Sequence, residues 1–513
     1  MPCHKVIVPK RELSELNAVF ASIRSDNNLI VDFPPEVQQY AAHMAANPPL
    51  PDQDCTDIPF VTIDPPSSMD LDQAVYMERS DNGYIVYYAI ADVPAFVELG
   101  SVLDTETLKR GETIYTPDVN VALHPTILSE NAASLLPDQI RSAYVWKFDL
   151  DHDANVLKTD LQRAKVKSQA KLNYDIVLQE IEKGTAEDNI ALLKEIGIKR
   201  LALEEKRGGV SLNTPTEEID HDGKNYVLNY RAPAPSEAWN AQISLMTGME
   251  AAKIMIEGKV GILRTMPAPA EENIQRLRRI ANALHQSWKE NVSYGDYIKT
   301  LNPENPKHAA ILYGASALFT GAAYTYFDGQ LPELTTQAAV AAPYAHTTAP
   351  LRRLVDRFVL PICDALKNNK EIPQELKDTA AKVPDILQAS DVLASKVNKE
   401  CIHAVEAAVL KNRVGETFQA SLLSIRDKGK QGIIQIHDPA IEANCKGPFN
   451  GKDTLNVKLL TADVETYSVK FANADAPENT QENQNSPENT TLHVKNPKQT
   501  TGQSPIQTAH QAE

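Results

Sequence analysis

The sequence predicts an α+β fold in which a large mixed domain stands between a short helical segment and a small β-barrel. Three observations carry this prediction. Apolar residues recur at helical spacing near the start, β-branched and aromatic runs alternate with helical stripes through the middle, and short strand-like runs separated by turns follow. A length of 513 residues exceeds one ordinary core, so several domains are expected.

The composition is that of a globular protein, with 42% hydrophobic and 23% charged residues. A net charge of −17 excludes a basic, non-specific nucleic-acid coat as the main design, although a local basic groove is compatible with it. The sequence lacks a membrane-length apolar run and a signal-peptide pattern, and its five scattered cysteines form no CxxC pair. We therefore expect a cytoplasmic protein with reduced thiols and no membrane attachment.

Residues 1–55 are predicted to form a helical arm. Apolar side chains recur at helical spacing in LSELNAVFASIR, at Leu13, Leu16, Val19, Phe20 and Ile23. The following PPEVQQYAAHMAANPPLP has prolines at both ends, which start and stop a second helix. This segment is too short for a pair of barrel domains.

Residues 56–410 are predicted to form one mixed α/β domain. PFVTI, YIVYYAIADV, AYVWKFDLD and the run ending in RAKVKSQAKL have the β-branched and aromatic content of strands. Helical stripes follow in 186–205 and in AEENIQRLRRIANALHQSW, where the stripe extends to Trp288. These stripes are interpreted as core faces.

Residues 411–475 contain four short strand candidates, TFQASLLSI, QGIIQIHD, TLNVKLLTA and TYSVKFA, which suggest an OB-like β-barrel, although any small sheet domain would fit. Residues 476–513 are rich in Asn, Gln, Thr and Pro and hold few large aliphatic side chains. Such a segment buries too little surface to offset its ordering entropy, so a disordered tail is predicted.

The segment TIDPPSSMDLDQA, residues 62–74, is the first candidate for chemistry. Asp70 and Asp72 are two residues apart and point the same way in an extended chain, and the proline-rich turn can bring Asp64 to them. Three converging carboxylates need a cation, and oxygen-only ligands select magnesium or manganese. The alternative is an Asp-rich turn with solvated carboxylates.

The segment YAHTTAPLRRLVDRF, residues 344–358, is the second candidate. Pro350 suits the first turn of a helix, which would leave Arg352, Arg353 and Arg357 available to bind anions near a helix N-terminus. The alternative is a surface helix in which Arg353 and Asp356 form an exposed pair.

Tyr115, in RGETIYTPD, is the third candidate, because an aromatic side chain in a strand-to-turn segment can stack on a base. The alternative is a core tyrosine. His124 and His346 belong to no metal-ligand pattern, and the sequence has no GxxxxGK[ST], GxGxxG or GxSxG motif. No nucleotide cofactor is therefore expected.

Taken in order, these segments resemble the catalytic domain of the ribonuclease II/R family, the RNB-domain exoribonucleases. The matching pieces are TIDPPSSMDLDQA, YYAIADVPAFVELGSVLDTETLKRGETIYTPD, LHPTILSENAASLLPD, SQAKLNYD and YAHTTAPLRRLVD. They cover about Asp57 to Leu410, and five ordered motifs make a chance similarity improbable. The chain resembles a bacterial short form of that family.

The resemblance implies a 3′-to-5′ exoribonuclease that hydrolyses single-stranded RNA to nucleoside 5′-monophosphates with Mg²⁺, or Mn²⁺ in its place. A monomer is expected. By motif, the implied metal ligands are Asp64, Asp70, Asp72 and Gln73, and the implied catalytic residues are Asp72, Arg352 and Tyr115. The implied RNA-binding residues are Tyr115, Lys171, His346, Arg352 and Arg353.

Three features depart from the family pattern. Gln73 stands where the family usually has a fourth aspartate; its amide oxygen can ligate but brings no charge, so a second metal would bind more weakly. The cold-shock barrels that usually precede the domain are replaced by the helical arm, which predicts reduced processivity. The family's glutamate near the end of the channel has no clear counterpart, because Asn240, Ala241 and Gln242 occupy that neighbourhood.

Two other functions remain open from the sequence. Gln73 and the missing barrels are compatible with a catalytically silent relative that holds RNA 3′ ends. An unrelated metal-dependent phosphohydrolase of small molecules is the third hypothesis. The retained set of Asp64, Asp70, Asp72 and Arg352 favours the exoribonuclease.

Overall fold

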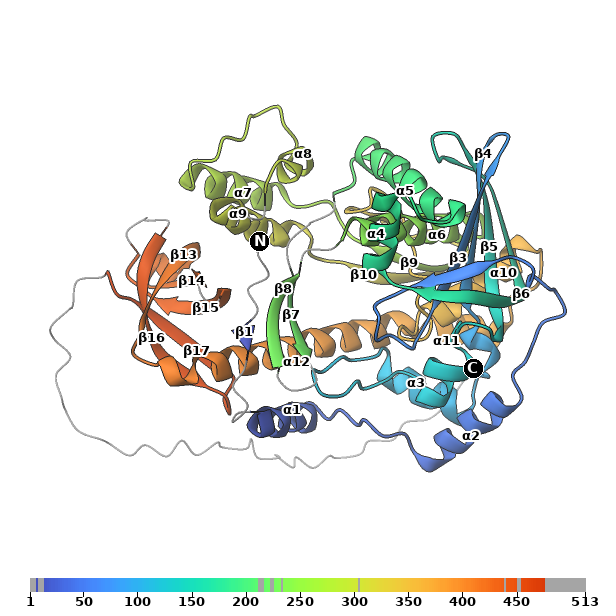
Figure 1. The fold of residues 1–513 in the computed structure, drawn as a ribbon, viewed down its shortest axis with the longest axis horizontal. Helices are drawn as coiled ribbons and strands as arrows, with labels where there is room; N and C mark the ends of the chain where they lie inside the picture. The colour runs from blue at the N-terminus through green and yellow to red at the C-terminus, as the bar shows by residue number, and fades with distance from the viewer. Residues whose placement is uncertain are drawn as a thin grey trace, which may run out of the picture. The chain divides into compact units, whose positions relative to one another are not determined.

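The computed structural model describes residues 6–7, 13–210, 216–221, 226–231, 234–302, 305–437, 440–449 and 454–475. Its elements confirm the predicted α+β class. Residues 1–475 form one compact unit, which contains two closed five-stranded barrels (Figure 1). The predicted disordered tail, 476–513, lies outside the described residues. No helix in the described part of the chain is long and apolar enough to cross a membrane.

The first barrel contains β2 (Phe60–Ile63), β3 (Gln73–Ser80), β4 (Gly83–Ala91), β5 (Ile140–Asp151) and β6 (Val156–Leu172). Strands β3 to β6 pair antiparallel in sequence order, and β2 closes the barrel by pairing parallel with β6. A two-residue turn joins β3 to β4 and needs glycine at position 83, where φ is +142° and a Cβ would lie 2.3 Å from the Asp151 backbone. Four of these strands were predicted from the sequence, whereas β3 and the closure of the barrel were not.

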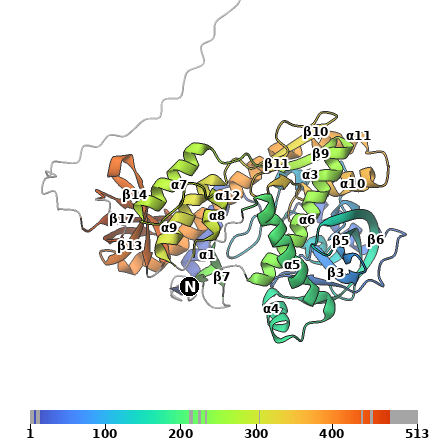
Figure 2. The same cartoon turned by 90° about the horizontal axis from the view of Figure 1, so that it is seen from above.

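Helices and short strands surround this barrel (Figure 2). The helices are α3 (Val102–Arg110), α4 (Tyr174–Lys183), α5 (Asp188–Arg207), α6 (Pro235–Gly258), α10 (Asp356–Lys367), α11 (Gln374–Ala380) and α12 (Val383–Leu410). The paired strands are β9 (Val260–Thr265) with β10 (Ala323–Asp328), and β11 (Thr336–Gln337) with β12 (Ala342–Pro343). One apolar core joins the barrel to α5, α6 and α10, through residues such as Trp146, Trp239 and Phe358.

The helical arm consists of α1 (Leu13–Asp26) and α2 (Pro35–Ala46). Leu16, Phe20 and Ile23 of α1 are fully buried, as the spacing predicts, and belong to the same core as α12 and the second barrel. The segment before α1 also contributes β1 (Val6–Ile7), which pairs with β8 (Tyr226–Arg231); β8 pairs with β7 (Thr216–His221). This three-stranded sheet was not predicted.

The second barrel contains β13 (Thr417–Arg426), β14 (Gln431–His437), β15 (Ala440–Lys446), β16 (Thr454–Asp463) and β17 (Ser468–Asn473). Its order, β13-β14-β15-β17-β16, exchanges the last two strands, as expected of a Greek-key OB-like barrel. Four of its strands were predicted and β15 was not.

Helices α7 (Glu271–Ala283), α8 (Tyr294–Lys299) and α9 (Pro306–Ala315) share a small core with Leu423 of the second barrel. The predicted helical stripe is shorter than expected, because α7 ends at Ala283. Trp288 lies beyond that end, where its ring stacks on Tyr297 with a centroid distance of 4.3 Å.

Candidate active site

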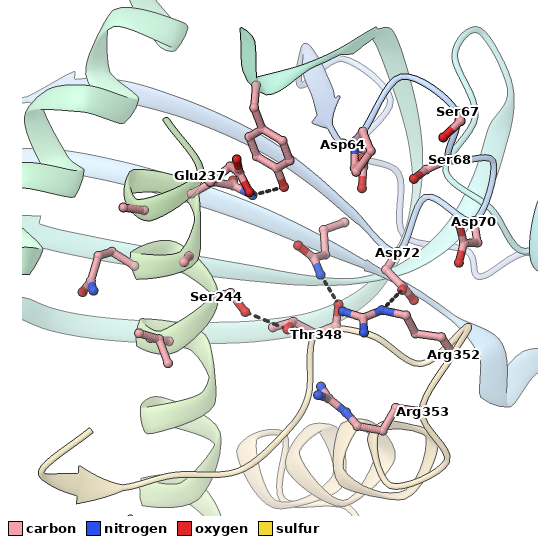
Figure 3. A pocket seen from close by; sticks show the side chains of 18 of the residues that line it. Asp64, Ser67, Ser68, Asp70, Asp72, Glu237, Ser244, Thr348, Arg352 and Arg353 are labelled. Atoms are coloured by element: carbon pink, nitrogen blue, oxygen red, sulfur yellow. Dashed lines mark hydrogen bonds and ion pairs between the residues drawn. The ribbon is translucent and has the colours of Figure 1, made fainter. Parts of the chain in front are cut away.

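A cavity of about 1030 Å³ opens beside the first barrel. Side chains from widely separated parts of the chain line it: the β2–β3 loop with the first residue of β3, the segment after α3, Glu130, the first residue of α4, Leu201 of α5, the N-terminal half of α6 and the loop before α10. Figure 3 shows that Asp64, Asp70, Asp72 and Arg352 all lie at this cavity. The three sequence segments singled out for chemistry therefore meet at one site.

The loop between β2 and β3, residues 64–72, is held at several points. The backbone N–H of Asp64 donates to Leu172 O at the end of β6, 3.1 Å away. Lys171 Nζ donates to the carbonyl oxygens of Pro66, at 2.8 Å, and of Ser68. Lys171 thus holds the loop through its backbone carbonyl oxygens. It is not one of the side chains that line the cavity.

Asp72 is the most constrained carboxylate of the site. It is only 4% exposed, and its Oδ1 accepts the backbone N–H of Leu351 at 2.7 Å. Its Oδ2 lies 3.8 Å from Arg352 Nε. Burial raises the pKa of Asp72 well above that of a free aspartate, against the opposing effect of the Arg352 charge.

Asp64 and Asp70 face the same cavity as Asp72. Burial, together with the charge of Asp70, raises the pKa of Asp64 to about 7, and burial also raises the pKa of Asp70. Asp64 Oδ2 is buried without a hydrogen-bond partner. A bound cation would satisfy that oxygen and favour the ionised carboxylates.

The donor set fits a hard divalent cation in kind, because it offers carboxylate oxygens, one of them unpartnered. The expected convergence is incomplete: among the residues described, no three His, Cys, Asp or Glu side chains stand close enough to hold a metal ion as placed. To share one ion, these carboxylates would have to draw closer together than they lie in this structure.

The loop before α10 corrects one prediction. α10 begins at Asp356 and not near Pro350, so Arg352 lies in a turn ahead of the helix. The reason is a long-range backbone pairing: Thr113 N–H donates to Arg352 O at 2.9 Å, and Leu354 N–H donates to Gly111 O at 3.1 Å. The Arg352 side chain is 47% exposed and lines the cavity, so it is available to bind a phosphate.

Arg353 and Arg357 are not free to bind anions, contrary to the prediction. Arg353 forms a two-bond pair with Asp356, at 2.5 and 2.8 Å, and that pair is buried, whereas the alternative interpretation placed it on an exposed surface. Arg357 is buried and donates to Asp104 at 2.6 Å. Both charges are neutralised inside the protein, although Arg353 still lines the cavity.

Tyr115 lines the cavity and is 49% exposed, so it is not the core residue of the alternative interpretation. The arm holds the loop that carries it. Arg24 of α1 donates to both carboxylate oxygens of Asp118, at 2.5 and 2.8 Å, and to Thr116 Oγ1 at 3.0 Å. The arm therefore helps to position Tyr115.

The two histidines do not line the cavity. His346 Nδ1 lies 2.8 Å from the Tyr324 hydroxyl, and the His346 ring packs edge-on against Tyr344. Burial lowers the pKa of His346 well below its usual value. His124 is buried and lies 2.9 Å from Leu351 O through Nδ1, so it supports the same loop as Arg352.

Gln73 lines the cavity beside Asp72, but both ends of its amide are occupied. Nε2 donates to Thr348 O at 2.5 Å, and Oε1 accepts the Tyr88 hydroxyl at 2.6 Å.

Several lining residues were not identified from the sequence. Tyr174 starts α4 after an Asn173 cap, and its hydroxyl accepts from Asn240 of α6 at 3.3 Å. Ser244 and Thr348 face each other, with 2.7 Å between their hydroxyl oxygens. The polar residues of SEAWNAQIS, on the N-terminal half of α6, were the available signal. Asn240, Ala241 and Gln242, which occupy the neighbourhood of the family's glutamate, do line the cavity.

Comparisons with known proteins identify two domains in this chain. The chain matches the RNB domain over residues 52–369 and the RNase II-type exonuclease C-terminal S1 domain over residues 416–474. Ribonuclease R of Mycoplasma genitalium is 24% identical over 434 residues, covering 80% of this chain and 59% of that protein. This chain thus spans about three fifths of the length of that relative.

Two solved structures share the fold. The apo form of Mycoplasma genitalium RNase R superposes with a TM-score of 0.79 at 20% identity, covering 89% of this chain and 78% of that chain. Yeast Ssd1, a pseudonuclease, superposes with a TM-score of 0.68 at 17% identity, covering 87% of this chain and 58% of that chain.

Proposed function

The chain belongs to the RNB-domain family, and from that premise we propose that it is a 3′-to-5′ exoribonuclease that hydrolyses single-stranded RNA to nucleoside 5′-monophosphates. One observation carries the proposal: the buried carboxylate of Asp72 and the exposed guanidinium of Arg352 lie at the same cavity, 3.8 Å apart.

The residues of this chain supply most of the expected chemistry. Arg352 has free donors at the cavity and stabilises the negative charge that grows on a phosphate during displacement. Tyr115 offers an exposed ring on which a terminal base can stack. A volume of about 1030 Å³ is at the upper end for a small-molecule site, which suits the end of a polymer.

We propose Mg²⁺, with Mn²⁺ as a substitute, as the cofactor. Asp64, Asp70 and Asp72 would hold it, and the unpartnered Oδ2 of Asp64 supports this assignment. When bound, such an ion activates water for phosphodiester hydrolysis. Asp64 must be ionised to serve, so metal affinity rises with pH through the pKa of about 7.

The second candidate is a catalytically silent protein that binds RNA 3′ ends. Two observations favour it: Gln73 replaces a carboxylate at the site, and Ssd1 shows that a pseudonuclease can share this fold. Against it stand the three cavity-facing aspartates and Arg352.

A time course on a 5′-labelled single-stranded RNA of about 30 nucleotides decides between the two, that length being enough to occupy a channel and its approach. We expect the RNA to shorten from its 3′ end with Mg²⁺ but not with EDTA, and chromatography of the products to show nucleoside 5′-monophosphates. Full-length RNA under both conditions, with binding shown by a gel shift, would establish the silent protein instead.

A further inference from the structure

Of the four residues expected to bind a metal, Gln73 has the side chain whose hydrogen bonds leave it least available to an ion. It is the first residue of β3, next to Asp72, and it pairs in register with Ile90 of β4. The side chain of Tyr88, two residues earlier on β4, lies on the same face of the sheet and donates its hydroxyl to Gln73 Oε1 at 2.6 Å. From the other end, Gln73 Nε2 donates to the Thr348 carbonyl oxygen at 2.5 Å.

This pair of bonds requires an amide at position 73. The Thr348 carbonyl oxygen accepts only, so its partner must donate, and a carboxylate cannot. Tyr88 is 1% exposed, and burial holds its pKa well above 10, so its hydroxyl keeps the proton that it gives to Oε1. An aspartate or glutamate at position 73 would therefore set a negative charge against a carbonyl oxygen.

The Gln73 bond reaches the loop that carries Arg352. Thr348 stands four residues before Arg352, and Leu351, next to Arg352, donates its N–H to Asp72. Asp72, the last residue of the β2–β3 loop, and Gln73, the first residue of β3, thus hold the Arg352 loop at two points. Asp72 is also expected to take part in the reaction. The Gln73 hydrogen bond can therefore be removed without changing a residue that is expected to react.

We propose that Gln73 is a positioning residue and not a metal ligand: it links Tyr88 of the barrel to Thr348 and so sets where Arg352 stands relative to Asp72. The consequence for the reaction rests on the proposed function, whereas the link itself does not.

The test compares two variants that break the link from opposite ends. Gln73→Met keeps the length of the side chain without its hydrogen bonds, and Tyr88→Phe removes only the hydroxyl, from a residue that does not line the cavity. The matched control is Tyr84→Phe on the same strand, where a 2% exposed tyrosine bonds Glu195 and Lys199 away from the site.

Two readouts need no activity: amide hydrogen exchange of the peptide that spans 344–355, and Mn²⁺ affinity of the RNA-free protein. We expect Gln73→Met to speed exchange in this peptide by about 10-fold, and Tyr88→Phe by less, because a buried hydrogen bond is lost. Mn²⁺ affinity should stay within about twofold of wild type. Gln73→Glu should loosen the loop as much as Gln73→Met, through repulsion from Thr348 O.

Unchanged exchange in Gln73→Met would overturn the proposal, as would a fivefold or larger loss of Mn²⁺ affinity without a change in the loop. If the wild-type protein cleaves RNA, kcat should fall about 10-fold in Gln73→Met with KM nearly constant, because Arg352 is displaced. If it cleaves nothing, the proposed function fails, but the exchange result still decides whether Gln73 holds the loop.

Discussion

The two five-stranded barrels have the same closed frame but place their parallel strands differently. In the first barrel the parallel pair is β2 with β6, the first and last strands, and it closes the cylinder. In the second barrel the parallel pair is β15 with β17, and closure comes from the antiparallel β13 and β16. Parallel strands end at one edge, so each pair delivers two chain segments to the same place.

The side chains that lie near the two parallel strand pairs differ between the barrels. β2 and β6 end at Ile63 and Leu172, where the loop 64–72 begins and Lys171 holds it. Around β15 and β17, Lys446 and Lys470 point outward and are exposed. Carboxylates that follow the first parallel pair suit a cation, whereas exposed lysines on the second parallel pair suit a phosphate backbone. We therefore expect mutations in the first barrel to change the rate and mutations in the second to change affinity.

Asp72→Asn should give the largest effect. Asparagine keeps an oxygen to accept the Leu351 N–H but removes the charge, so cleavage should fall by at least about 100-fold while RNA binding stays nearly intact. Single-turnover cleavage and a filter-binding assay measure the two quantities. Asp160→Asn, a half-exposed carboxylate of β6 paired with Lys158, is the control. A large loss of binding in Asp72→Asn would contradict its assignment.

Arg24→Met should give the next largest effect, through the loop that carries Tyr115. The Arg24–Asp118 pair is mostly buried, and its loss frees the loop that carries Tyr115, the residue proposed to stack on a base. We expect KM to rise about 3- to 10-fold with kcat little changed, since only part of the about 1.5–3 kcal/mol that a charge-assisted bond contributes is transmitted to the position of Tyr115. Arg79→Met, which breaks an exposed pair on the first barrel, should leave KM unchanged. An unaltered KM in Arg24→Met would show that the arm does not act on Tyr115.

Replacing Lys446 and Lys470 with glutamine tests the second barrel alone. RNA affinity should fall about two- to fourfold, and the dependence of affinity on salt concentration should weaken, because each phosphate contact contributes to that slope. kcat should not change. Binding titrations at three salt concentrations measure this, with Lys158→Gln on the first barrel as the control. A salt dependence of RNA affinity equal to that of the wild type would show that these two lysines of the second barrel do not contact RNA.

The smallest effect concerns stability. Each barrel carries one carboxyl whose pKa is raised to about 7, Asp64 at the first and Glu442 on β15 of the second. Burial alone raises the pKa of Glu442, so the folded state holds its proton more tightly than the unfolded chain. Its contribution to stability is therefore lost as pH rises from about 4.5 to about 7.

Glu442→Gln should accordingly raise Tm by a few degrees at pH 8 and leave it unchanged at pH 4. Thermal unfolding with and without Mg²⁺ compares the two barrels. The ion should raise the Tm of the wild type through Asp64, and the rise in Tm caused by Glu442→Gln should be the same with and without the ion. An increment that disappears with Mg²⁺ would place Glu442, too, at a cation site.

Local chemistry predicted much of the fold, because strands such as 83–91 and 140–151 have β-branched and aromatic runs long enough to identify. β3 and β15 were missed for the opposite reason. QAVYMERS and AIEANCK mix polar and small residues with the apolar ones, and only pairing with neighbours makes them strands. Closure of the first barrel depends on Phe60 meeting Ser168, a contact more than a hundred residues apart.

The candidate site shows the same limit. The spacing of Asp64, Asp70 and Asp72, and the position of Arg352, pointed to one place, and all four lie at one cavity. The helix predicted to begin near Pro350 starts instead at Asp356, because residues 111–113 and the side chain of Asp356 hold the intervening turn. The partners of Gln73 lie 15 and 275 residues away, so no local pattern could reveal them.

The burial of α1 has a consequence for how the protein is made. Leu16, Phe20 and Ile23 share their core with Val405 of α12 and Phe471 of β17. During synthesis at about 5–20 residues per second, about 20 to 90 seconds therefore pass between the synthesis of α1 and that of Phe471. A ribosome that stalls inside the second barrel would leave the apolar face of α1 open to chaperones or to aggregation, so complete translation is a condition for a stable N-terminus.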